Sequence, residues 1–175
     1  MKINSLNILI NQASVLNKKF YFISGNEKTL MEKIKTIIIE GFKEKQNVQI
    51  KSIETIIDFV DEVGLFENKS IYIVNGNKGI DIEVLDNLRS SESHFIFLQE
   101  NSQKIKKIKN LFITDKDSYL IDCYELDKDS KIKILNEFLR VNKLEILQDV
   151  YWFLIDKLDS KYIFFEKNLN KVLEL

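Results

Sequence analysis

Residues 20–29 of this 175-residue chain read Phe20-Tyr21-Phe22-Ile23-Ser24-Gly25-Asn26-Glu27-Lys28-Thr29, and this stretch decides the fold. Four apolar residues lead into a polar turn that contains glycine, which is typical of a buried strand followed by a loop. Apolar residues then recur at helical spacing from Leu30 to Phe42, and Asn26 is a candidate cap for that helix. The stretch therefore predicts a strand, a loop and a helix.

The same alternation continues along the chain after an amphipathic opening stretch between Ile3 and Leu16. Further strands are predicted at Val48 to Ile50, Ile71 to Val74, Phe95 to Leu98 and Tyr119 to Cys123, with helices at Ile53 to Val60 (ending near Gly64), Ile80 to Leu88 and Lys104 to Phe112. Apolar strands that alternate with amphipathic helices favour a parallel sheet covered on both faces. We expect an α/β fold with five parallel strands.

The strand pattern stops at Leu126. Three helices are predicted after it, at Lys131 to Val141, Leu144 to Leu158 and Lys161 to the end of the chain. This change of pattern predicts an α/β domain at residues 1–126 and a small all-α domain at residues 127–175. The last helix keeps its apolar face up to Leu175, so we expect further protein beyond it.

Composition narrows the classes of function. The 26 Lys+Arg and 27 Asp+Glu residues give a formal net charge of −1, so the whole surface cannot attract nucleic acid, and Arg89 and Arg140 are the only arginines available for reading bases. The single cysteine, Cys123, and the single histidine, His94, exclude an internal disulfide and a closed zinc site. Apolar runs are far shorter than a membrane span needs. These features predict a cytoplasmic, metal-free protein with no membrane association.

The loop after the first predicted strand is a poor phosphate-binding loop. A working loop needs Gly, four residues, then Gly-Lys-Ser/Thr, so that enough backbone N–H groups surround the phosphate. Here Lys28 and Thr29 follow Gly25 too early, there is no second glycine, and Glu27 adds negative charge. We therefore expect a degenerate loop and no bound cofactor. The alternative is a diverged P-loop nucleotide kinase or NTPase that uses Lys28 and Thr29 on phosphate.

No catalytic residue is predicted. The ends of the later strands lack the acidic pair that would hold magnesium, and neither His94 nor Cys123 has an arrangement of partners that would activate it. A basic run at Lys104, Lys106, Lys107 and Lys109 is expected to form the solvated outer face of one helix. The sharper alternative is a weak role in steering DNA phosphates or an acidic partner.

Two large apolar residues, Leu65 and Phe66, follow Gly64 and directly precede a polar turn. Such a pair can close the end of a helix by packing onto it. If the two side chains are exposed, they would instead form a compact anchor for an apolar pocket on another protein. Spacing alone leaves both interpretations open.

The chain resembles the delta subunit of the bacterial DNA polymerase III clamp loader over essentially its whole length. The resemblance lies in Phe20 to Glu27, which is similar to that family's Tyr-Leu-x-x-Gly-x-Glu/Asp pattern, and in Gly64-Leu65-Phe66 just before the strand Ser70 to Val74. The final stretch, Leu169 to Leu175, is similar to the family's Glu-Leu-x-Lys-Leu region. The order of these pieces along the chain agrees as well.

The resemblance implies an AAA+-type module that does not bind ATP, followed by a small helical domain. It implies that Leu65 and Phe66 insert into a pocket of the sliding clamp, the beta subunit, with Gly64 allowing the turn that presents them. It also implies contact with the other loader subunits, gamma/tau and delta-prime, through a C-terminal collar domain that this chain does not reach. The expected function is a non-catalytic one: to bind the clamp and help open it for loading onto DNA during replication. A delta-prime-like stator is disfavoured because its cysteine cluster and Ser-Arg-Cys motif are absent.

Overall fold

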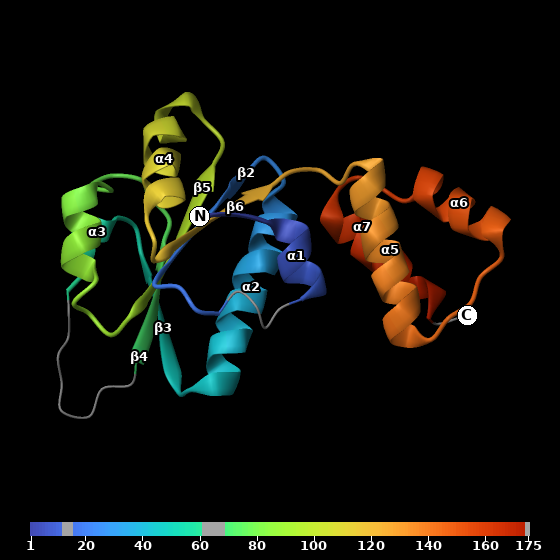
Figure 1. The fold of residues 1–175 in the computed structure, drawn as a ribbon, viewed down its shortest axis with the longest axis horizontal. Helices are drawn as coiled ribbons and strands as arrows, with labels where there is room; N and C mark the ends of the chain where they lie inside the picture. The colour runs from blue at the N-terminus through green and yellow to red at the C-terminus, as the bar shows by residue number, and fades with distance from the viewer. Residues whose placement is uncertain (12–15, 61–68, 174–175) are drawn as a thin grey trace.

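A computed structural model describes residues 1–11, 16–60 and 69–173 of the chain (Figure 1). Its centre is a six-stranded sheet in the order β1-β6-β2-β5-β4-β3, in which every neighbouring pair of strands is parallel. The strands are β1 (Lys2–Asn4), β2 (Phe20–Gly25), β3 (Val48–Ile53), β4 (Lys69–Val74), β5 (His94–Glu100) and β6 (Ser118–Cys123). The α/β class and the parallel sheet are confirmed.

The sheet has six strands and not the predicted five, because the first residues of the chain add β1 at one edge. Strand β1 pairs with β6, with Ile3 opposite Ile121. The amino group of Met1 also donates to the carbonyl oxygens of Phe112 and Ser118, both at 3.0 Å. A strand of three residues has no periodicity to detect, so only the position of its partner reveals it.

Each face of the sheet carries its own half of the core. Along β2, Tyr21 and Ile23 pack with helices α1 (Ser5–Ile10) and α2 (Lys28–Lys45), whereas Phe20 and Phe22 pack with α3 (Ile82–Leu88) and α4 (Lys106–Thr114). All four of these side chains are fully buried. Because successive side chains of a strand point to opposite faces, burial on both faces requires the continuous apolar run seen in the sequence.

The helix predicted from Ile53 to Val60 is wrong in the described residues. Strand β3 runs on to Ile53, and between it and Val60 the only helical geometry is a 3-10 turn at Ile56–Asp58. The carbonyl oxygen of Ile53 accepts a bond from the N–H of Asn75, which extends the pairing with β4. Valine and isoleucine favour strands over helices, and pairing with β4 outweighs the helical spacing of the apolar residues.

The last part of the described chain forms the three predicted helices, α5 (Lys128–Asn142), α6 (Gln148–Lys157) and α7 (Tyr162–Val172). Asp127 caps α5 by accepting from the N–H of Ser130 at 2.8 Å, and Lys143 ends it with a left-handed φ of 53°. Buried residues of these helices, such as Leu135 and Phe165, belong to the same apolar cluster as the buried face of α2. The division into domains at residues 126 and 127 stays a prediction.

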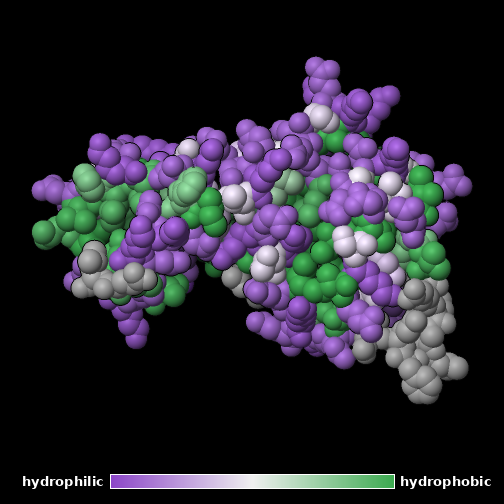
Figure 2. Space-filling model, turned by 180° about the vertical axis from the view of Figure 1, so that it is seen from behind, coloured by the Kyte–Doolittle hydropathy of each residue, from purple (hydrophilic) through white to green (hydrophobic). Residues whose placement is uncertain are grey.

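Apolar surface gathers over the C-terminal helices, at the left of the view in Figure 2. The exposed large apolar side chains in this part of the chain are Val141, Leu147, Val150, Trp152, Phe153, Ile163, Phe164 and Leu173. Within the described residues, none of the helices combines the length and the apolar character needed to cross a membrane.

Candidate functional site

The loop after β2 is pressed against the end of β6. A methyl group on Gly25 would lie 1.7 Å from the carbonyl oxygen of Cys123, so only glycine fits there. The backbone N–H groups of Asn26 and Glu27 both donate to that oxygen, at N···O distances of 3.2 and 3.3 Å. The first two N–H groups of the loop are therefore used within the fold.

The carboxylate of Glu27 caps helix α2. This side chain is 5% exposed and accepts from the N–H groups of Thr29 at 3.2 Å and Leu30 at 2.6 Å. The Thr29 hydroxyl also donates to it, at 2.8 Å. A helix N-terminus attracts anions because its N–H groups are unpaired and its dipole is positive there. In this protein a side-chain carboxylate accepts from the N–H groups of Thr29 and Leu30 at this helix N-terminus.

The prediction that Asn26 caps this helix is therefore wrong by one residue. The N–H of Asn26 is held by Cys123, and the helix begins only at Lys28. The longer side chain of Glu27 can fold back onto the first turn of α2, which places its two oxygens within reach of the unpaired N–H groups.

The structure brings Gly25, Lys28 and Thr29 together in this loop, but Lys28 and Thr29 are paired with other groups. Lys28 Nζ lies 2.7 Å from Glu100 Oε1 at the end of β5, with both side chains about 70% exposed. Thr29 Oγ1 accepts from the N–H of Ile163 at 3.2 Å, so the first turn of α7 is joined to the first turn of α2. The arrangement does not aim a lysine and a hydroxyl at a shared phosphate.

A groove of about 580 Å³ lies beside this loop, where β4 and β5 end. In α/β proteins with a parallel sheet, ligands bind beside the carboxyl ends of the strands, where this groove lies. The groove is lined by Lys28, Met31, Glu32, Asn75, Leu98, Gln99, Glu100, Asn101 and Ser102. Its one lysine is already paired with Glu100, and Gln99 Nε2 donates to the carbonyl oxygen of Asn75 at 2.9 Å. Among residues 1–11, 16–60 and 69–173, no three His, Cys, Asp or Glu side chains cluster as a metal site.

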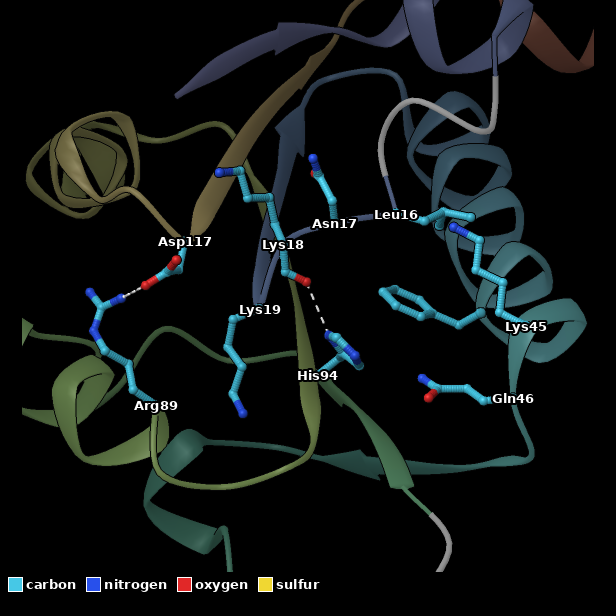
Figure 3. A pocket seen from close by; sticks show the side chains of 10 residues that line it. Leu16, Asn17, Lys18, Lys19, Lys45, Gln46, Arg89, His94 and Asp117 are labelled. Atoms are coloured by element: carbon cyan, nitrogen blue, oxygen red, sulfur yellow. Dashed lines mark hydrogen bonds and ion pairs between the residues drawn. The ribbon is translucent and has the colours of Figure 1, made fainter.

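His94 lies in a second pocket, of about 490 Å³, near the amino ends of the strands (Figure 3). Its Nδ1 donates to the carbonyl oxygen of Lys18 at 3.0 Å, and its ring lies 4.1 Å from the ring of Phe42, centroid to centroid. Burial lowers the pKa of His94, although the bond to Lys18 opposes this change. Cys123 is fully buried in β6, and burial raises the pKa of its thiol far above the ordinary value. His94 is thus held by a backbone carbonyl and an aromatic ring, and Cys123 is part of the buried core.

The basic run divides into two parts. Lys104 in the 3-10 turn before α4, and Lys106 and Lys107 at the start of α4, are exposed, as the sequence predicts. Lys109 differs, because its Nζ lies 2.9 Å from Asp122 Oδ1 and its side chain is 15% exposed. The expectation that all four lysines cover a solvated face is therefore wrong for Lys109, whose position in α4 points it at the end of β6.

Asp122, near the carboxyl end of β6, forms ion pairs with two lysines. Lys2 and Lys109 both pair with it, at 2.8 and 2.9 Å. Burial alone would raise the pKa of Asp122, but hydrogen bonds from these two lysines, together with their charges, hold that pKa below its ordinary value. No local sequence pattern predicts this cluster, since its members come from three distant elements.

The predicted anchor residues, Gly64, Leu65 and Phe66, lie outside the described residues. The structure therefore describes only the chain on either side of them, up to Val60 and from Lys69. Sequence reasoning also missed Ile57 and Val60, which are strongly exposed just before this segment. Their apolar character was attributed to a buried helix face.

Comparison with solved structures gives a likeness over 95% of the chain to the Bacillus subtilis DNA clamp loader delta protein, with a TM-score of 0.63 and 14% sequence identity. The chain spans 56% of the length of that protein. At this level of identity the likeness shows a shared fold, which agrees with the fold expected from the resemblance.

Two weaker likenesses involve proteins that initiate replication. AMPPCP-bound DnaA from Aquifex aeolicus is 17% identical, with 97% of this chain and 59% of that chain covered and a TM-score of 0.48. Domain III of Thermotoga maritima DnaA is 12% identical, with 98% and 79% covered and a TM-score of 0.44. No protein-family model and no curated protein sequence matches the chain.

Proposed function

We propose that this chain is the clamp-binding part of a delta-type clamp-loader subunit. It binds the ring-shaped sliding clamp and helps open it for loading onto DNA during replication, without binding or hydrolysing ATP. The observation that carries the proposal is the Glu27 carboxylate at the N-terminus of α2, within a fold shared with the Bacillus subtilis DNA clamp loader delta protein.

The hydrogen bonds of the loop support a role without nucleotide. The N–H groups of Asn26 and Glu27 donate to Cys123, and those of Thr29 and Leu30 donate to the Glu27 carboxylate. A phosphate at this position would need these donors and would meet a negative charge already bound to them. The same geometry opposes the alternative of a nucleotide kinase or NTPase, because Lys28 and Thr29 are paired elsewhere.

In this proposal the work is done by binding. Leu65 and Phe66 insert into an apolar pocket of the clamp, and Gly64 permits the turn that presents them. A ligand that prefers the opened form of a ring shifts the population toward that form by the difference between its two affinities. No bond needs to be made or broken by this chain, and it is proposed as a non-catalytic subunit that works in the cytoplasm.

The remaining partners follow from the same proposal. Contacts with the other loader subunits, gamma/tau and delta-prime, would be made by a collar domain outside this sequence. Lys104, Lys106 and Lys107 are exposed and could add only a weak attraction to DNA phosphates, because the net charge of the chain is −1.

The test is a binding titration with the sliding clamp encoded by the same genome. We expect Leu65→Ala combined with Phe66→Ala to abolish binding, because two buried anchors contribute about 2–4 kcal/mol each at a typical contact. The circular dichroism spectrum and the melting temperature should stay close to those of the parent chain. Unfolding of the double variant would instead place the pair in the core and contradict the proposal.

A further inference from the structure

The turn after β3 presents two apolar side chains to solvent. Ile57 is 69% exposed and Val60 is 68% exposed, whereas Ile56 between β3 and Ile57 is 4% exposed. Phe59 is also directed inward, with its ring 4.9 Å from that of Tyr72, centroid to centroid. Inward and outward side chains thus alternate within five residues.

Local contacts fix this alternation. Asp58 Oδ2 accepts from the backbone N–H of Thr55 at 3.0 Å and from its hydroxyl at 2.9 Å, which closes a capping box around the 3-10 turn. Gly79, with a φ of +75°, leaves room for the outer side chain, because a methyl group there would lie 2.5 Å from Ile57 Cγ1. The turn is therefore held in the conformation that exposes Ile57.

The chain segment that carries the two residues is acidic, although exposed Lys78 adjoins Gly79, against which Ile57 lies. Residues 52–68 contain no lysine or arginine, and their acidic residues are Glu54, Asp58, Asp61, Glu62 and Glu67. Glu54 and Asp58 are both exposed. A partner for this surface would need an apolar patch bordered by basic side chains.

The turn also lies near the predicted anchor in the chain. Leu65 follows Val60 by five positions, so their Cα atoms are at most about 18 Å apart. That span lies within a contact of ordinary size between two proteins. One partner surface can therefore cover both.

We propose that Ile57 and Val60 form a second apolar contact with the sliding clamp, on a clamp surface that is apolar and bordered by lysine or arginine. This inference rests on the proposed function. It assigns a role to two side chains whose exposure the fold does not require, because the neighbouring Ile56 and Phe59 already anchor the turn.

The experiment titrates the same clamp with the parent chain and with Ile57→Ala combined with Val60→Ala. We expect the Kd to rise about tenfold or more, with a melting temperature unchanged within about 2 °C, because both side chains are exposed. The matched control is Val141→Ala combined with Leu147→Ala; Val141 in α5 is 61% exposed and Leu147, which precedes α6, is 77% exposed. The control should bind like the parent.

A charge reversal, Glu54→Lys, gives a second arm that leaves the apolar residues in place. It should slow association with the clamp, and the difference should shrink as salt is added. A Kd within twofold of the parent for the Ile57 and Val60 variant, together with lost binding for the Leu65 and Phe66 variant, would overturn this inference and leave the proposed function standing. No binding by the parent chain would overturn both.

Discussion

Replacing Glu27 tests the idea that a side chain has taken the place of a phosphate. In Glu27→Ala the N–H groups of Thr29 and Leu30 and the Thr29 hydroxyl all lose their acceptor. Loss of an N-cap costs about 1–2 kcal/mol, and loss of a negative charge at a helix N-terminus adds about 0.5–1 kcal/mol. For a chain of 175 residues, about 2–4 °C of melting temperature corresponds to each kcal/mol. The expected decrease is therefore about 3–12 °C.

Glu27→Gln is the matched variant, because it keeps the shape and one acceptor oxygen but removes the charge. We expect it to melt between the parent and Glu27→Ala. The emptied helix N-terminus of Glu27→Ala should also bind an anion, and sulfate at ten times its Kd would restore about 1.4 kcal/mol. Thermal melts in sodium sulfate and in sodium chloride of equal ionic strength measure this effect.

Two results would refute the reasoning. A melting temperature for Glu27→Ala within 1 °C of the parent would mean that the carboxylate does not stabilise the helix. Equal effects of sulfate on the parent and on Glu27→Ala would mean that the site of the anion is elsewhere.

The other predictions concern the ion pairs of Asp122 and the buried ring of Phe22. Asp122→Asn should lower the melting temperature at pH 7, because it removes the charge that pairs with Lys2 and Lys109. Since the folded pKa of Asp122 is depressed, this stabilisation is fully present above the unfolded pKa of about 3.9 and is lost as the pH falls through the folded pKa, so the difference between the two melting temperatures should shrink below about pH 4. A difference that stays constant from pH 7 to pH 3 would contradict the pairing. Phe22→Ala should cost about 3–5 kcal/mol in urea unfolding, because its ring is fully buried 4.6 Å from that of Phe112, whereas Phe153→Ala, at a residue 60% exposed, should cost under about 1 kcal/mol. Equal losses for the two phenylalanines would contradict the described core.

Sequence patterns predicted the parts of the fold that local chemistry determines. The apolar run from Phe20 to Ile23 is buried on both faces of a parallel sheet, and the helical spacing after it produces α2. The patterns failed where a distant partner decides. Strand β1 depends on pairing with β6, and β3 continues to Ile53 because β4 lies beside it.

The site shows the same division. The spacing of Gly25, Lys28 and Thr29 marked the loop as unlike a phosphate-binding one, which stays a prediction, and Glu27 was noted for its negative charge. The sequence did not predict that the Glu27 carboxylate caps α2. This cap depends on the carbonyl oxygen of Cys123, which accepts from the N–H groups of Asn26 and Glu27 and so positions the loop. Lys109 was assigned to solvent for a similar reason, since its partner Asp122 comes from another strand.

The most direct test of the account is a calorimetric titration of this chain with its own sliding clamp, run with and without Mg-ATP. We expect the clamp to bind with the same Kd in both conditions and Mg-ATP alone to give no heat. Micromolar binding of Mg-ATP, or clamp binding that requires the nucleotide, would contradict a scaffold whose phosphate position is filled by Glu27.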